Sequence, residues 1–78
     1  MAKEKKAEII EQLGAAYAET RLGITRMEYL KDLSYDAEMV VVYGKDDTSM
    51  FDILVTGDSG AQMIFDVVEK IENELVRG

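Results

Sequence analysis

Residues 38 to 56 read EMVVVYGKDDTSMFDILVT and decide the fold, because their apolar pattern is that of two β-strands joined by a turn. Residues 38–43 contain three consecutive valines, which favour a strand covered on both faces. Residues 49–56 instead alternate apolar and other side chains, as a strand with one buried face does. The intervening GKDDT is rich in turn formers and has the length of a hairpin loop. We therefore expect an antiparallel hairpin here.

Two helices are predicted before this hairpin. Apolar residues recur every three to four positions over residues 3–22, and Gly23 suits the left-handed residue that closes a helix. Gly14 interrupts this first helix and predicts a close approach of another backbone. A capping box formed by Thr25 with the glutamate three positions later predicts a short second helix over residues 26–34.

A last helix is predicted over residues 60–76, where the helical period returns. Its expected apolar face consists of Ala61, Ile64, Phe65, Val68, Ile71 and Leu75. Residues 1–78 are therefore expected to form one small α+β domain of order α-α-β-β-α, a two-stranded antiparallel hairpin packed by helices. Because an isolated two-stranded sheet is marginal and has open edges, we expect two chains to pair into a four-stranded sheet in a homodimer.

The composition excludes several kinds of chemistry. The 78 residues include neither cysteine nor histidine, which removes disulfides, thiolate nucleophiles, zinc-thiolate sites and the commonest general base. We expect no catalytic residue, no metal site and no cofactor. No apolar run approaches the ~20 residues that cross a bilayer, and the charged start does not resemble a signal peptide. The sequence thus favours a cytoplasmic protein without a membrane partner.

The stretch GDSG, residues 57–60, resembles the segment that carries the nucleophilic serine of chymotrypsin-like proteases. It is also similar to the nucleophile elbow of α/β-hydrolases, although Ala61 replaces the last glycine of that motif. Both families need a histidine base, which this chain lacks. We therefore interpret Asp58 or Ser59 as the cap of the last helix.

The charge is unevenly distributed along the chain. The net charge is −7, and residues 27–78 hold twelve acidic and four basic side chains. Such a surface repels nucleic-acid phosphates and speeds encounter with basic proteins. The hairpin loop contains paired aspartates, and such carboxylates can bind a hard cation. Because the EF-hand pattern is missing, we interpret these aspartates as solvated loop residues.

These observations predict a small acidic, non-enzymatic protein-binding module, an inhibitor or regulator that engages a basic surface of a partner protein. Its acidic face is predicted to consist of Asp32, Asp36, Glu38, Asp46, Asp47 and Asp52. A narrower hypothesis is nucleic-acid charge mimicry, in which these carboxylates occupy the binding groove of a DNA- or RNA-handling protein. Small acidic inhibitors of phages and other mobile elements act in this way, by analogy of size and charge. No direct nucleic-acid binding is expected from this interpretation.

Two alternatives remain open at this point. Residues 18–31 loosely resemble a helix-turn-helix, a resemblance that implies a DNA-binding dimer in which Arg21, Arg26 and Lys31 contact phosphates. The second alternative is a dimer that binds a small ligand in a polar cavity near Ser59.

Overall fold

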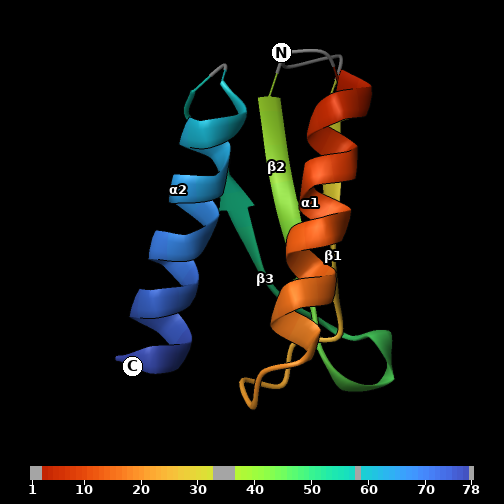
Figure 1. The fold of residues 1–78 in the computed structure, drawn as a ribbon, viewed down its shortest axis with the longest axis vertical. Coiled ribbons are helices and arrows are strands. Elements are labelled where there is room, and N and C mark those ends of the chain that lie inside the picture. The colour runs from red at the N-terminus through yellow and green to blue at the C-terminus, as the bar shows by residue number, and fades with distance from the viewer. Residues whose placement is uncertain (1–2, 33–36, 58, 78) are drawn as a thin grey trace.

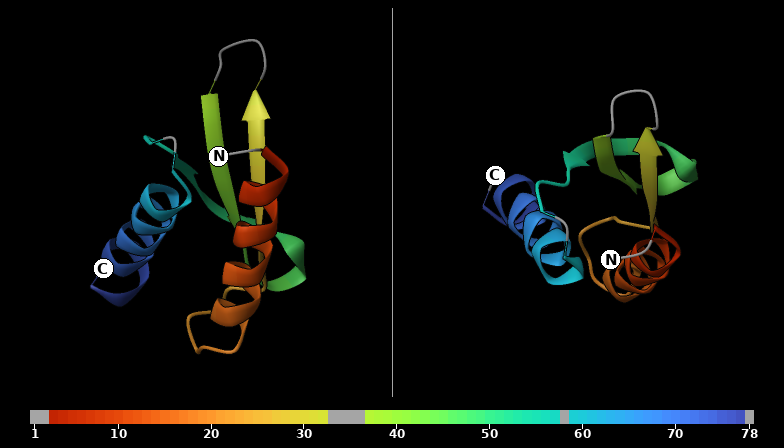
Figure 2. Two further views of the ribbon diagram at one scale, coloured as in Figure 1. Left: turned by 45° about the horizontal axis from the view of Figure 1, so that its top comes forward. Right: turned by 90° about the horizontal axis from the view of Figure 1, so that it is seen from above.

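Two helices pack on one side of a three-stranded antiparallel sheet (Figures 1 and 2). The computed structural model describes residues 3–32, 37–57 and 59–77. In chain order the elements are α1 (Lys3–Ala18), β1 (Arg26–Asp32), β2 (Ala37–Tyr43), the 3-10 turn η1 (Lys45–Asp47), β3 (Ser49–Leu54), α2 (Gly60–Ile71) and the π-helical turn η2 (Glu72–Val76). The small α+β domain and the central hairpin are confirmed.

The predicted second helix is wrong, because residues 26–32 form the strand β1. Thr25 does not cap a helix there; its hydroxyl donates to the carbonyl of Gly44 at 2.9 Å, and its amide donates to Tyr43. Pairing with the valine-rich strand β2 outweighs the local capping signal, since it covers an edge that the hairpin alone leaves open. The order is therefore α-β-β-β-α, and the helix-turn-helix interpretation lacks its second helix.

The strands follow one another in the sheet in the order β1-β2-β3, with every neighbour antiparallel. On the side toward the helices, Val40 lies between Tyr29 of β1 and Ile53 of β3. On the opposite side, Val41 lies between Glu28 and Asp52. Side chains alternate along each strand. With this register, the side chains of all three strands therefore form two faces of the sheet, one toward the helices and one away from them.

The core lies between the sheet and the two helices. Its fully buried members come from every layer: Ile10, Val40, Val42, Met63, Val67 and Ile71. Figure 2 shows both helices on the same side of the sheet, so no helix within the described residues covers the other side. No helix within the described residues is both long and apolar enough to cross a bilayer.

Helix α1 packs closely on β1 because of a glycine. A Cβ added at Gly14 would lie 2.6 Å from the backbone nitrogen of Met27, so the predicted close backbone approach is confirmed. After the helix, Gly23 has a φ of 87°, the left-handed conformation that glycine adopts without steric cost. The chain then turns back into β1.

Helix α2 is capped as expected, since the Ser59 hydroxyl accepts from the amide of Gln62 at 3.1 Å. Its buried face includes Ile71, as predicted, but is otherwise shifted from the predicted one. Met63 and Val67 are buried, whereas Phe65 is 59% exposed. Asp66 ties the helix to the end of β3, because its carboxylate accepts from the amide and the hydroxyl of Thr56. These bonds fix a rotation of α2 that turns Phe65 toward solvent.

Candidate functional site

The side of the sheet away from the helices is the leading candidate site, and we call it the open sheet face. It is formed by the outward side chains of the three strands: Arg26, Glu28, Leu30, Met39, Val41, Tyr43, Asp52 and Leu54. In Figure 2 the helices lie on the other side of the sheet. Because nothing within the described residues packs on this face as a layer, its composition determines what it can bind.

Neighbouring side chains on the open sheet face form rows across the strands. One row is apolar and consists of Leu30, Met39 and Leu54, of which Leu54 is 62% exposed. The next row places Val41 between the carboxylates of Glu28 and Asp52. Methionine and exposed leucine beside carboxylates resemble an apolar centre with a polar rim, the arrangement common in protein interfaces.

One end of the open sheet face is fixed by a polar cluster. The guanidinium of Arg26 lies 3.7 Å from the centre of the Tyr43 ring and binds Asp47 through two hydrogen bonds of 2.6 and 3.1 Å. These bonds hold the pKa of Asp47 below its ordinary value. The Tyr43 hydroxyl donates to Glu28 at 3.2 Å. The positive charge of Arg26 is thus already engaged by an acid of the same chain.

The six predicted acidic residues are not gathered on one surface as far as the structure describes them. Asp52 lies on the open sheet face and is exposed, and Asp46 is exposed in the adjoining turn η1. Asp47 is paired with Arg26. Asp36 and the side chain of Asp32 lie outside the described residues.

The sixth acid, Glu38, points to the helix side of the sheet. Its Oε1 lies 2.7 Å from the Nζ of Lys6, which is only 3% exposed, and it also accepts from the hydroxyl of Tyr29. The hydrogen bonds from Lys6 and Tyr29 lower the pKa of Glu38. Burial and the bond to Glu38 raise the pKa of Tyr29, so this phenol stays protonated. This cluster joins α1, β1 and β2.

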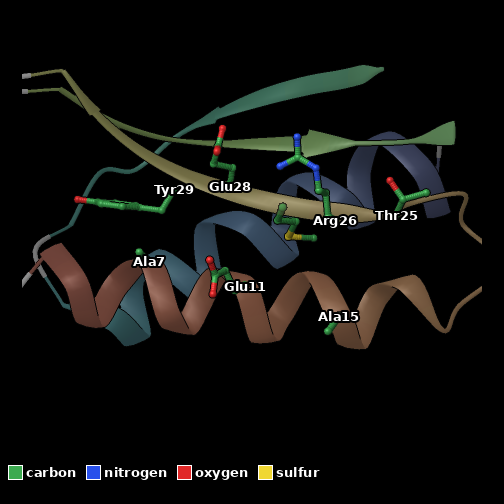
Figure 3. A pocket seen from close by; sticks show the side chains of 8 residues that line it. Ala7, Glu11, Ala15, Thr25, Arg26, Glu28 and Tyr29 are labelled. Carbon is green, nitrogen blue, oxygen red and sulfur yellow. The ribbon is translucent and has the colours of Figure 1, made fainter. Parts of the chain in front are cut away.

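A second surface feature is a groove of about 390 Å³ between α1 and β1 (Figure 3). Ala7, Glu11 and Ala15 project from α1 toward the strand, and Glu28 lies on the strand above them. We call this feature the β1 groove. A smaller cavity of about 260 Å³ lies between β3 and α2.

The structure also bears on a metal site. Among the described residues, no three acidic side chains converge as metal ligands.

Sequence reasoning missed Glu28, Leu30 and Tyr43 as members of a surface. The predicted helix over residues 26–34 contains the first two, whereas the structure aligns them with β2. A signal was present, because Met27 and Tyr29 alternate with the charged Arg26 and Glu28, which is a strand period.

Comparison with protein-family models, with curated proteins and with solved structures gives no match for this chain.

Proposed function

We propose that the protein is a non-enzymatic binding module that engages a basic surface of a partner protein through the open sheet face. The observation that carries this proposal is the pair of adjacent rows on that face, one apolar and one with two carboxylates. A partner that offers an apolar side chain flanked by lysine or arginine would complement both rows. The net charge of −7 would speed encounter with such a partner and repel nucleic acid.

The apolar row is expected to supply most of the affinity and the carboxylates most of the selectivity. Leu30 and Leu54 are large apolar side chains that remain exposed, and burying them against a partner removes them from water. Asp52 would select basic groups and make the association rate depend on salt. The narrower form of the proposal, charge mimicry, adds that the partner uses the same surface to bind nucleic acid.

A homodimer forms part of this proposal as well. Among the described residues β3 is an edge strand of the sheet, so one side of it has no strand neighbour there, and the exposed Leu54 lies on this strand. Pairing of two β3 strands would extend the sheet across two chains. Sedimentation equilibrium over a wide concentration range tests it, and a chain that stays monomeric at millimolar concentration contradicts it.

Affinity capture from host extract at low and high salt tests the proposed partner class. Partners are identified, purified and titrated against the wild type, Leu30→Ser, Asp52→Lys and the matched control Glu8→Lys, whose exposed carboxylate lies on α1. We expect binding that weakens with salt and falls about tenfold in Leu30→Ser and Asp52→Lys but not in the control. Equal losses in Asp52→Lys and Glu8→Lys would contradict a role for the open sheet face. Competition by duplex DNA for the same partner would support charge mimicry.

A further inference from the structure

The backbone of β3 has hydrogen-bonding groups that point away from β2. In an antiparallel pair, the N–H and C=O groups of successive residues point alternately toward the neighbouring strand and away from it. The amide of Val55 donates to the carbonyl of Glu38 at 3.0 Å, and the register extends this alternation back along β3. The backbone groups of Asp52 and Leu54 therefore point toward the edge of the sheet. Both residues are exposed, Leu54 by 62%.

Helix α2 lies at this edge and takes one amide that points outward. The amide of Thr56, two residues beyond Leu54, donates to the carboxylate of Asp66 at 3.0 Å. This bond agrees with the alternation derived from Val55. In the part of the chain that the structure describes, β3 has a strand neighbour on one side only. The outward backbone groups of Asp52 and Leu54 are therefore available to another main chain.

Space for another strand lies between β3 and α2. It is the cavity of about 260 Å³ described above, which we call the β3 cavity and which is lined by residues 52–54 together with Asp66, Glu69, Lys70 and Asn73. A helix with its side chains is about 10 Å wide and neighbouring strands lie about 4.8 Å apart, so two helices can cover about four strands. The described sheet has three. Figures 1 and 2 show α2 in the helix layer beyond β3, so a fourth strand at this edge would lie over α2.

The charges of the β3 cavity favour a basic occupant. Three of its lining residues are acidic, and its one cation, Lys70, is ion-paired with Glu74 at 2.9 Å. The exposed carboxylates of Asp52 and Glu69 make no hydrogen bond or ion pair with another described residue. A second copy of the chain would bring the carboxylate of its own Asp52 to this edge, whereas lysine or arginine would complement the acids already there.

We propose that the β3 cavity binds an extended, basic segment of a partner protein, which adds to the edge of β3 as a fourth, antiparallel strand. The main chain of the segment pairs with Asp52 and Leu54, as in other cases of strand addition. Residues directly opposite these two share their face of the sheet, so an apolar side chain there lies beside the exposed Leu54. The alternate residues point toward α2 and are lysine or arginine, opposite Glu69. This inference rests on the proposed function in taking a basic protein as the partner, and the bound segment excludes a second copy from the same edge.

A labelled, end-blocked peptide Lys-Val-Lys-Val-Lys-Val-Lys is the probe. With its lysines toward α2 and its valines beside Leu54, the valines are the residues whose amides bond to β3. N-methylation of the valines removes these donors without changing charge, whereas N-methylation of the lysines removes amides that point away from β3. We expect the first change to weaken binding at least about tenfold and the second to leave the affinity within about twofold. Equal affinities of the two methylated peptides would overturn the proposal.

Variants of the protein provide the second arm of the test. Glu69→Lys should weaken peptide binding about tenfold, because it replaces an acid of the β3 cavity by a cation. Glu8→Lys makes the same change of charge at an exposed position of α1 and is the matched control. At about 0.15 M salt, charges farther away than about 8 Å are largely screened, so the control should bind like the wild type. Thermal unfolding of each variant checks that it folds. Equal losses in the two variants would count against the β3 cavity.

Hydrogen exchange locates the bound peptide independently of affinity. The amides of Asp52 and Leu54 should gain protection on titration, whereas the amide of Tyr29, on the strand at the other edge of the sheet, should not change. Protection at Tyr29 alone would refute binding at β3. Sedimentation with saturating peptide should show one chain for each peptide. A dimer of chains that persists would show that a second copy occupies the edge, and it would overturn the proposal.

Leu30→Ser separates this inference from the proposed function. Leu30 belongs to the open sheet face but lies on β1, away from the β3 cavity. The variant should therefore impair the captured partner and spare the peptide. A partner that is lost in Leu30→Ser, with a peptide that shows no preference between the methylated forms, would leave the proposed function standing and refute strand addition. A peptide that shows the preference, with a captured partner that is insensitive to Leu30→Ser, would support strand addition and contradict the open sheet face.

Discussion

A Cβ added at Gly14 would lie 2.6 Å from the backbone nitrogen of Met27, closer than real Cβ atoms approach such a neighbour. This relationship joins the middle of α1 to the start of β1 and fixes how deep the helix lies on the sheet. It also sets one wall of the β1 groove, since Ala15 is the next residue of the helix.

Gly14→Ala should destabilise the protein by about 1–3 kcal/mol, the usual effect of overpacking. In an unconstrained helix the same change would stabilise by up to about 1 kcal/mol. Urea unfolding measures the free energy of unfolding. Ala16→Gly, at an exposed position of the same helix, reports the propensity effect alone. A Gly14→Ala protein more stable than the wild type would show that the two elements are not in close contact.

The buried ion pair between Lys6 and Glu38 should be essential to the fold. Removing one partner leaves a charge without compensation in a protected site, so Glu38→Gln is expected to cost about 3–5 kcal/mol. Lys70→Met is the matched control, because the pair it breaks with Glu74 is largely exposed and contributes only about 0.5 kcal/mol. Similar losses in the two variants would contradict a structural role for the buried pair.

Stability should fall in acid partly because of Glu38. Its folded pKa lies below the ordinary value of 4.5, so the stabilisation is fully present above that pH and is lost as the pH falls through the lower, folded value. Asp66, which accepts from Thr56, also has a lowered pKa and adds to the same trend from its ordinary value of 3.8. Denaturant unfolding between pH 7 and pH 2 should show a shallower acid decline in Glu38→Gln. An identical slope in both proteins would exclude this contribution.

The central hairpin could be predicted because its signals are local. The valines of β2, the alternation in β3 and the loop between them each specify a short segment, and the cap at Ser59 depends only on residues that follow it. The strand β1 could not be predicted in the same way. Its local sequence fits a capped helix, and only the register with β2, a long-range contact, decides for a strand.

The candidate site was only partly accessible from sequence for the same reason. Asp52 is exposed on the open sheet face, but Glu38 and Asp47 have partners, Lys6 and Arg26, that lie far away in the chain. No count of charges along a sequence reveals such pairs. The sequence does not predict the β1 groove, because one of its walls is the strand β1, which the sequence pattern predicts as a helix.

The cap of α2 should contribute measurably to stability. Ser59→Ala removes the acceptor for the amide of Gln62 and should cost about 1 kcal/mol, while Ser59→Asp should retain most of the stability. Ser49→Ala, at an exposed serine of β3, serves as the control. Thermal unfolding measures the effect. If the Ser59→Ala protein were as stable as the control, another group would have to cap the helix.

The rotation of α2 is tested by two substitutions two positions apart. The sequence pattern placed Phe65 in the core, whereas the structure buries Met63 completely and leaves Phe65 at the surface. Met63→Ala should therefore cost about 2–5 kcal/mol, because it leaves a cavity. Phe65→Ala should change the free energy of unfolding by less than about 1 kcal/mol, since an exposed ring loses little on truncation. Chemical denaturation of both variants at low protein concentration gives these values without interference from self-association. If Phe65→Ala were the more damaging change, α2 would have to pack on the sheet through the face that the sequence pattern predicted.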